Sequence, residues 1–225
     1  AAIVDRLRAD GYKVVPLDLQ GADDVTICDV TDPEAVQVVA DSIGPVDLLV
    51  NNAAVWRFAA LEDVTEADFG IALDVNLKGA FHCAQSFGRS MLERKTGVII
   101  NIVSIAAKHA NPAVGSYGPS KAALLSLTEQ IALEWGPRGI RCNAVGPGLV
   151  PTPGTGSVYD DPEVRAVRAE AVPLRRLAEP SDIAGVVSFL ASDDASYVNG
   201  QVIYVDGGLS KGLMPLLPRP SDIPH

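Results

Sequence analysis

A serine, a tyrosine and a lysine occur in fixed register between residues 101 and 121. Tyr117 and Lys121 stand four residues apart at the start of a segment with helical periodicity, and Ser104 closes an apolar run. Residues at i and i+4 share one helix face, about 5–6 Å apart at Cβ. A cation beside a phenol favours the phenolate and lowers its pKa from the ordinary value of about 10. The pattern predicts a general acid–base that works near neutral pH.

Short apolar strands and helices alternate around this register. Strands are expected over residues 12–18, 25–30, 46–54, 97–103, 139–145 and 201–205, and helices over 1–10, 31–42, 65–94, 116–135, 161–170 and 180–192. This alternation predicts an α/β fold, a Rossmann-like doubly wound parallel sheet with helices on both faces. We find no repeat and no linker, so we expect one domain over residues 1–210, followed by a proline-rich tail over 211–225.

Polar residues follow the ends of four expected strands. They are Asp18, Asp29, Asn51 and Ser104, and a Pro/Gly-rich loop that begins at Pro147 follows a fifth. Ligands of open parallel sheets bind beyond the carboxyl ends of the strands. The sequence therefore predicts that these residues share one edge of the sheet, and that this edge holds a ligand site.

Composition and charge exclude several other kinds of partner. The 225 residues carry a formal net charge of −10 without a basic cluster, which argues against nucleic acid and anionic membranes. No apolar run reaches the ~18 residues of a membrane span. The three cysteines, Cys28, Cys83 and Cys142, lie far apart in apolar segments. We expect buried free thiols in a reducing, cytoplasmic setting and, because the histidines lack ligand spacing, no metal site.

Several short motifs resemble, in order and spacing, those of the short-chain dehydrogenase/reductase family. They are Asp29-Val30, Asn51-Asn52-Ala53-Ala54, Asn76 within DVNLKG, Ser104, Tyr117-x-x-x-Lys121, Pro147-Gly148 with Thr152, and Asp206-Gly207-Gly208. Each motif is weak alone, but together they cover nearly the whole chain. The resemblance implies a single-domain oxidoreductase that uses a nicotinamide cofactor, and, by analogy with the family, a homo-oligomer (a tetramer or a dimer).

The resemblance also implies catalytic roles for four residues. Tyr117 would exchange a proton with the substrate oxygen, and Lys121 would lower the pKa of Tyr117 and hydrogen-bond the nicotinamide ribose. Ser104 would donate a hydrogen bond to the same substrate oxygen. Asn76 would lie at a bend in a long helix and hold a water that passes protons to the lysine. Hydride would move directly between cofactor and substrate carbon.

Asp18 bears on the choice of cofactor. In this fold, an acidic residue that ends the second strand hydrogen-bonds the ribose 2′-hydroxyl and repels a 2′-phosphate. The segment LQGADDV after Asp18 has no Lys or Arg to receive a phosphate, so we expect NAD rather than NADP. The cofactor-binding residues implied by the resemblance are Asp18, Asp29, Val30, Asn51, Ala53, Ala54, Tyr117, Lys121, Pro147, Gly148, Val150 and Thr152. Ala54 stands where the family usually has glycine.

The chain departs from the family at its front. The family begins with a strand and a glycine-rich turn that holds the cofactor pyrophosphate, whereas residues 1–10 already read as the following helix. That strand is central in the sheet, and unpaired buried ladder groups cost about 1–3 kcal/mol each. We therefore expect that an N-terminal strand and turn precede the given residues.

We interpret the chain as an oxidoreductase that moves hydride between a nicotinamide cofactor and a secondary alcohol or ketone of small to medium size. One alternative is a non-catalytic dinucleotide-binding regulatory or scaffold protein, against which the intact Asn–Ser–Tyr–Lys set argues. Another is a related epimerase or dehydratase with the same Tyr-x-x-x-Lys pair, usually in longer chains. A hydrolase built on Ser104 is disfavoured because no G-x-S-x-G elbow surrounds it.

Overall fold

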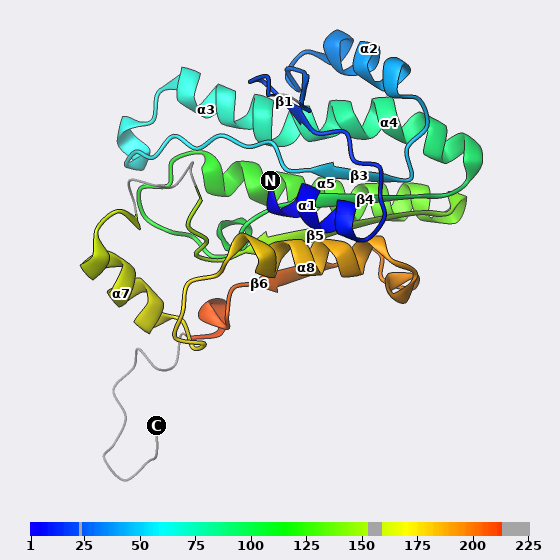
Figure 1. The fold of residues 1–225 in the computed structure, drawn as a ribbon. Coiled ribbons are helices and arrows are strands. Elements are labelled where there is room, and N and C mark those ends of the chain that lie inside the picture. Colours follow the sequence, from blue (N-terminus) through cyan, green and yellow to red (C-terminus); the bar gives the residue numbers. More distant parts are fainter. Residues whose placement is uncertain (23, 153–158, 213–225) are drawn as a thin grey trace.

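A four-stranded parallel sheet forms the centre of the molecule (Figure 1). The computed structural model describes residues 1–22, 24–152 and 159–212. The strand order of the sheet is β3-β4-β5-β6, made by Leu48–Asn51, Gly97–Ile102, Ile140–Pro147 and Val202–Val205. All neighbouring pairs are parallel, so the carboxyl ends of these strands meet at one edge, as expected from the sequence.

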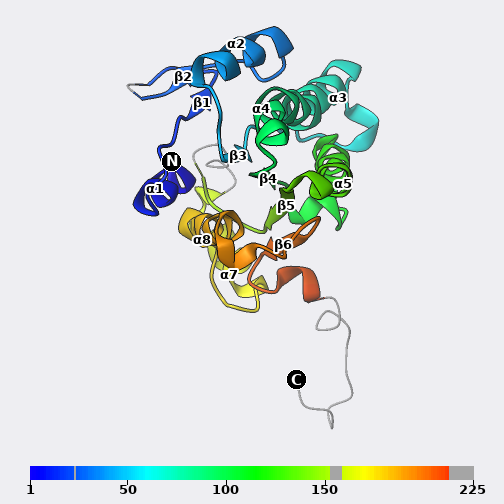
Figure 2. The same cartoon turned by 90° about the vertical axis from the view of Figure 1, so that its right-hand side faces the viewer.

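Helices cover both faces of this sheet, which confirms the predicted Rossmann-like α/β architecture. Figure 2 shows α1 and α8 on one side of the sheet and α4 and α5 on the other. The helices are α1 (Ala2–Ala9), α2 (Pro33–Ile43), α3 (Glu66–Leu73), α4 (Ala80–Arg94), α5 (Tyr117–Trp135), α7 (Pro162–Ala171) and α8 (Pro180–Ala191). Short 3₁₀ turns lie at Leu61–Asp63, Ile105–Ala107, Gly136–Arg138, Asp193–Ala195 and Leu209–Lys211. None of the helices in the described residues is long and apolar enough to cross a membrane.

The apolar run of β4 is continuous because both faces of this strand are covered. Ile99 and Ile100 are fully buried, and successive side chains of a strand point to opposite faces. Ile100 belongs to the cluster that includes Val187 of α8, whereas Ile99 packs with Ile131 of α5. Burial on both faces is typical of parallel sheets and explains why this strand does not alternate between apolar and polar residues.

Two parts of the sequence-based prediction differ from the structure. The strands expected over 12–18 and 25–30 are reduced to β1 (Leu17–Asp18) and β2 (Thr26–Ile27), which pair only with each other. They form a separate two-stranded parallel sheet, because no described strand links β1 to β3. The helix expected over 65–94 is divided into α3 and α4 by a π-helical segment, η2 (Asp74–Gly79). Residues 213–225 of the expected tail, and 153–158 of the expected loop, lie outside the described residues.

The three cysteines are buried free thiols, as predicted. Burial raises the pKa of the Cys83 thiol to about 12. Cys28 and Cys83 lie in the cluster between α2 and α4, whereas Cys142 lies in β5. Among the described residues, no three His, Cys, Asp or Glu side chains form a group that could hold a metal ion.

Candidate active site

The first turn of α5 carries both members of the tyrosine–lysine pair. Tyr117 is the first residue of the helix, and Lys121 follows one turn later on the same face. The Lys121 Nζ atom lies 5.9 Å from the centroid of the Tyr117 ring. Pro119 is accommodated because a proline in the first turn loses no intrahelical hydrogen bond. The spacing seen in the sequence therefore does bring the phenol and the ammonium together.

Lys121 is a buried cation, with a relative exposure of 1%. Its Nζ donates a hydrogen bond of 2.8 Å to the carbonyl oxygen of Ile102, at the end of β4. Burial lowers the pKa of Lys121 to about 8, because the apolar interior disfavours the charged form. A buried amine whose pKa is lowered this strongly is typical of a functional site rather than of a residue that stabilises the fold.

The pKa of Tyr117 differs in direction from the sequence-based expectation. Burial raises the pKa of its phenol, and a side-chain hydrogen bond with Ser104 offsets this only in part. The net pKa of Tyr117 is therefore raised, whereas the spacing predicted a lowered one, because desolvation outweighs the hydrogen bond. Tyr117 is a protonated phenol at neutral pH, which suits it to donate a proton.

Ser104 lies just beyond β4, next to the acid–base. It is half-buried and caps the 3₁₀ turn Ile105–Ala107, where its Oγ accepts a hydrogen bond of 3.1 Å from the backbone N–H of Ala106. A hydroxyl has one donor and two acceptor positions. Ser104 can therefore keep this cap while its proton is directed at another oxygen.

Asn76 lies in η2, at the bend that the family resemblance implied, and is 1% exposed. Its Nδ2 donates to the Val55 carbonyl oxygen and to Ser120 Oγ, both at 2.9 Å, and its Oδ1 accepts from the Val55 N–H at 2.7 Å. Ser120 Oγ in turn donates to the Tyr117 carbonyl oxygen at 2.7 Å. The side chain thus connects the segment after β3 to α5, and its role in a proton relay stays a prediction.

Asn51 ties neighbouring elements of the sheet together. Its Nδ2 donates to Asn101 Oδ1 of β4 at 2.8 Å, and Asn101 Nδ2 donates to Thr128 Oγ1 of α5 at the same distance. These hydrogen bonds between buried side chains link β3 to β4 and β4 to α5. Ala53 and Ala54 follow at the same edge, exposed and half-buried respectively.

Asp18 and Asp29 lie at the carboxyl ends of β1 and β2. Asp18 is exposed, and its Oδ1 accepts a hydrogen bond of 3.2 Å from the N–H of Gln20. Asp29 Oδ1 accepts from both the N–H and the hydroxyl of Thr31, and these bonds lower the pKa of Asp29. Val30 is half-buried beside Gly79, where an added Cβ would meet its Cγ2 at 2.6 Å. The structure therefore places both carboxylates at strand ends, but in the separate β1–β2 sheet.

The Pro-Gly and Asp-Gly-Gly motifs meet at the ends of β5 and β6. Pro147 ends β5, and the Gly148 N–H donates to the Val205 carbonyl oxygen at 3.0 Å. A Cβ on Gly148 would lie 2.8 Å from the Cα of Asp206, so this crossing requires glycine. Asp206 is buried and accepts from the N–H groups of residues 208 and 210. Val150 and Thr152 follow and are half-buried.

Comparisons with known proteins identify the family to which this chain belongs. Residues 1–210 match a family model described as enoyl-(acyl carrier protein) reductase. An oxidoreductase of the short-chain dehydrogenase/reductase family from Burkholderia thailandensis superposes with a TM-score of 0.88 at 31% identity, covering 96% of this chain and 89% of that one. The chain belongs to the short-chain dehydrogenase/reductase family. It is therefore an oxidoreductase that uses a nicotinamide cofactor on C–OH or C=O groups.

Named relatives in this family act on different substrates. The 3-oxoacyl-(acyl-carrier-protein) reductase FabG of Staphylococcus epidermidis is 36% identical over 210 residues, 92% of this chain and 82% of FabG. The reductase MabA of Mycobacterium tuberculosis is 38% identical over 223 residues, 94% of this chain and 88% of MabA. A gluconate 5-dehydrogenase from Burkholderia cenocepacia, solved with NADP and tartrate, superposes with a TM-score of 0.82 at 31% identity, covering 95% and 82%.

The structure adds two features that sequence reasoning missed in this short-chain dehydrogenase/reductase. Trp56 lies beside the acid–base, with its ring centroid 6.4 Å from that of Tyr117 and the two planes at 90°. Its only signal in the sequence was its place two residues after the Asn-Asn-Ala-Ala motif.

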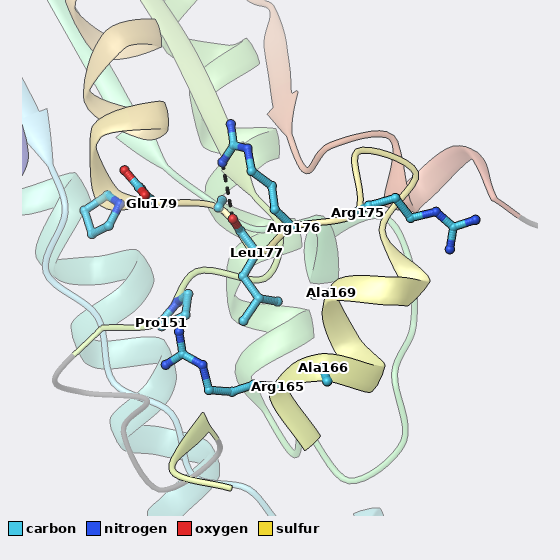
Figure 3. A pocket seen from close by; sticks show the side chains of 10 residues that line it. Pro151, Arg165, Ala166, Ala169, Arg175, Arg176, Leu177 and Glu179 are labelled. Atoms are coloured by element: carbon cyan, nitrogen blue, oxygen red, sulfur yellow. Dashed lines mark hydrogen bonds between the residues drawn. The ribbon is translucent and has the colours of Figure 1, made fainter. Parts of the chain in front are cut away.

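The second feature is a pocket of about 500 Å³ between α7 and residues 175–180 (Figure 3). Ala166, Ala169 and Leu177 line it, and Arg165 extends from α7 toward Pro151. The Arg165 side chain makes no hydrogen bond or ion pair with any described residue. Arg176 also lines the pocket, but both of its terminal nitrogens are bonded to Asp182.

Proposed function

We propose that this enzyme reduces a ketone, or oxidises the corresponding secondary alcohol, with Tyr117 as the proton donor or acceptor. The observation that supports this most directly is the grouping of Tyr117, Ser104 and the buried Lys121 at the end of β4. A bound nicotinamide cofactor supplies or accepts the hydride. In reduction, the Tyr117 hydroxyl gives its proton to the carbonyl oxygen, and the Ser104 hydroxyl stabilises the negative charge that develops there.

The described residues fit a nicotinamide cofactor. An ammonium has three donors, and one of those on Lys121 is taken by the Ile102 carbonyl. The others suit the hydroxyls of the nicotinamide ribose. We assign the remaining cofactor contacts to Asp18, Asp29, Val30, Asn51, Ala53, Ala54, Pro147, Val150 and Thr152.

We propose that NAD is preferred over NADP, because the exposed Asp18 carboxylate would repel a 2′-phosphate. Replacing Asp18 by alanine is expected to raise the ratio of kcat/KM for NADPH to that for NADH by roughly tenfold, or 1.4 kcal/mol. Steady-state kinetics with both cofactors measure this ratio. Asp41→Ala, an exposed carboxylate on α2, serves as the matched control and should leave the ratio unchanged. A solved relative carries NADP, so a similar protein binds the other cofactor. A wild-type enzyme that prefers NADP would overturn this proposal.

We further propose that the carbonyl substrate carries an anionic group, which Arg165 binds. The pocket joins an apolar floor to an arginine without a carboxylate partner among the described residues. Acyl-carrier thioesters are the named substrates of two relatives, and tartrate, a dicarboxylate, occupies a third. Both ligands combine a carbonyl or hydroxyl with negative charge elsewhere in the molecule.

The test compares matched anionic and neutral ketones, such as a 3-oxo acid and its ester, and 3-oxoacyl thioesters of phosphopantetheine and of its dephosphorylated form. Arg165→Gln is expected to raise KM for the anionic members roughly tenfold while leaving the neutral members unchanged. Arg168→Gln is the control, because Arg168 of the same helix lies over the Tyr159 ring instead. Equal KM changes for anionic and neutral substrates would remove Arg165 from substrate binding.

We also propose that the enzyme is a cytoplasmic homo-oligomer. The buried reduced thiols suit a reducing compartment. Large apolar side chains remain exposed on the helices, with Leu133 of α5 at 74% relative exposure. Such residues suit a surface that a second copy of the chain covers.

A further inference from the structure

Trp56 stands in direct aromatic contact with the acid–base. The centroids of the Trp56 and Tyr117 rings are 6.4 Å apart and their planes are perpendicular, which is one of the preferred geometries of aromatic pairs. Lys121 lies 5.9 Å from the same tyrosine ring. Trp56 and Lys121 thus both lie close to the phenol ring, and the two residues come from segments far apart in the sequence.

The backbone just before Trp56 is held by a buried side chain. Asn76 uses its amide oxygen and nitrogen to bind the N–H and the carbonyl of Val55, at 2.7 and 2.9 Å. The second hydrogen of the same Asn76 nitrogen goes to Ser120 Oγ on α5, at 2.9 Å. The residue that precedes Trp56 is therefore fastened to the helix that carries Tyr117.

The backbone just after Trp56 is held as well. Gly115 has a positive φ of 56°, and a Cβ on it would lie 2.5 Å from the carbonyl oxygen of Arg57, so only glycine permits this approach. The Arg57 guanidinium lies 3.5 Å from the carboxylate of Asp68, whose carbonyl oxygen accepts a hydrogen bond from Ser116. Both sides of Trp56 are thus joined to the chain immediately before or within the first turns of α5.

We propose that Trp56 is a positioning residue for Tyr117, which holds the phenol ring in orientation and keeps water away from it. This inference rests on the proposed role of Tyr117 as acid–base. Proton transfer requires the hydroxyl to be aimed at the substrate oxygen, and a small misplacement of a reacting group lowers the rate steeply. A ring fixed by an indole on one side and a helix on the other has few orientations to explore.

The test compares Trp56→Ala with Trp56→Phe. Loss of the ring in Trp56→Ala is expected to lower kcat for ketone reduction by about tenfold, with the dissociation constant of NADH unchanged. Trp56→Phe keeps an aromatic partner and should restore most of the rate. Because burial raises the pKa of Tyr117, removing the indole should also move the alkaline limb of the kcat profile to lower pH. A purely structural role would change stability without moving this limb.

Trp135→Phe is the matched control. Trp135 is the last residue of α5 and packs on Gly88 of α4, whereas Tyr117 is the first residue of α5. Its replacement should leave kcat and the pH profile unchanged.

The inference would be overturned if Trp56→Ala kept the wild-type kcat and pH profile in an enzyme that Tyr117→Phe inactivates. An enzyme indifferent to Tyr117→Phe would instead overturn the proposed function. If Trp56→Ala does not fold, Trp56→Leu is assayed with the same expected loss, and full activity in it is equally decisive against the inference.

Discussion

Replacing Tyr117 by phenylalanine is expected to lower kcat for ketone reduction by about 10³-fold. The ring remains, so the contacts with Trp56 and Lys121 persist. Only the hydroxyl that exchanges the proton is lost. Steady-state oxidation of NADH with a panel of ketones measures the rate, and quenching of NADH fluorescence measures cofactor binding, which should be retained.

Tyr12→Phe is the control for loss of a hydroxyl in itself. The Tyr12 hydroxyl donates to the Ala191 carbonyl at 3.3 Å, and the residue is half-buried near α8. Its removal should leave kcat unchanged. If Tyr117→Phe turned over ketones as fast as the wild type, Tyr117 could not be the acid–base, and the proposed mechanism would fail.

The raised pKa of Tyr117 also predicts how the two reaction directions depend on pH. Reduction needs the protonated phenol, which persists through neutral pH because burial raises its pKa. The rate of reduction should therefore be level near neutrality and fall only in alkaline solution. Oxidation needs the phenolate as proton acceptor, so its rate should rise with pH over the same alkaline range. Both limbs should disappear in Tyr117→Phe.

Replacing Lys121 by methionine is expected to stabilise the fold at pH 7 while removing most activity. Burial lowers the pKa of Lys121 from 10.5 to about 8, and this shift corresponds to about 3 kcal/mol against folding. Loss of the hydrogen bond to the Ile102 carbonyl destabilises the variant by about 1–2 kcal/mol and offsets part of this effect. The net rise in the free energy of unfolding should be about 1–2 kcal/mol by denaturant titration.

The sign of this effect fixes its pH dependence. Below about pH 8 the lysine is charged in both the folded and the unfolded state, so the wild type bears the full cost of the buried cation. Between about pH 8 and 10.5 the folded state loses the proton first, and the wild type gains stability. The advantage of Lys121→Met should therefore shrink across this range. A gap that stays constant with pH would contradict a buried charged lysine.

Lys78→Met provides the matched control for this change. Lys78 lies in η2 and forms an exposed ion pair of 2.7 Å with Asp74. Exposed pairs contribute at most about 1 kcal/mol, so stability should change little and activity should be retained. Reduced stability in Lys121→Met together with full activity would show that the lysine is a structural residue.

Local patterns in the sequence were sufficient to predict much of the fold and the placement of several proposed site residues. The apolar runs predicted β3–β6 and their parallel pairing, because a strand that is buried on both faces of a parallel sheet shows no alternation of apolar and polar residues. The four-residue spacing placed Tyr117 and Lys121 on one helix face, because helical periodicity is a property of the backbone alone. Ser104 and Asn51 lie at one edge because they stand at the carboxyl ends of neighbouring parallel strands.

Tertiary structure decided the features that depend on what packs against these residues. The pKa of Tyr117 moves upward because desolvation outweighs its hydrogen bond to Ser104, and no spacing in the sequence states how deeply a side chain is buried. β1 and β2 are short because their only strand partner among the described residues is each other. The contact of Trp56 with Tyr117 and the place of Arg165 in a pocket both depend on segments that are distant in the chain. Sequence periodicity sets which residues share a face, whereas burial and contact between distant segments set what those residues can do.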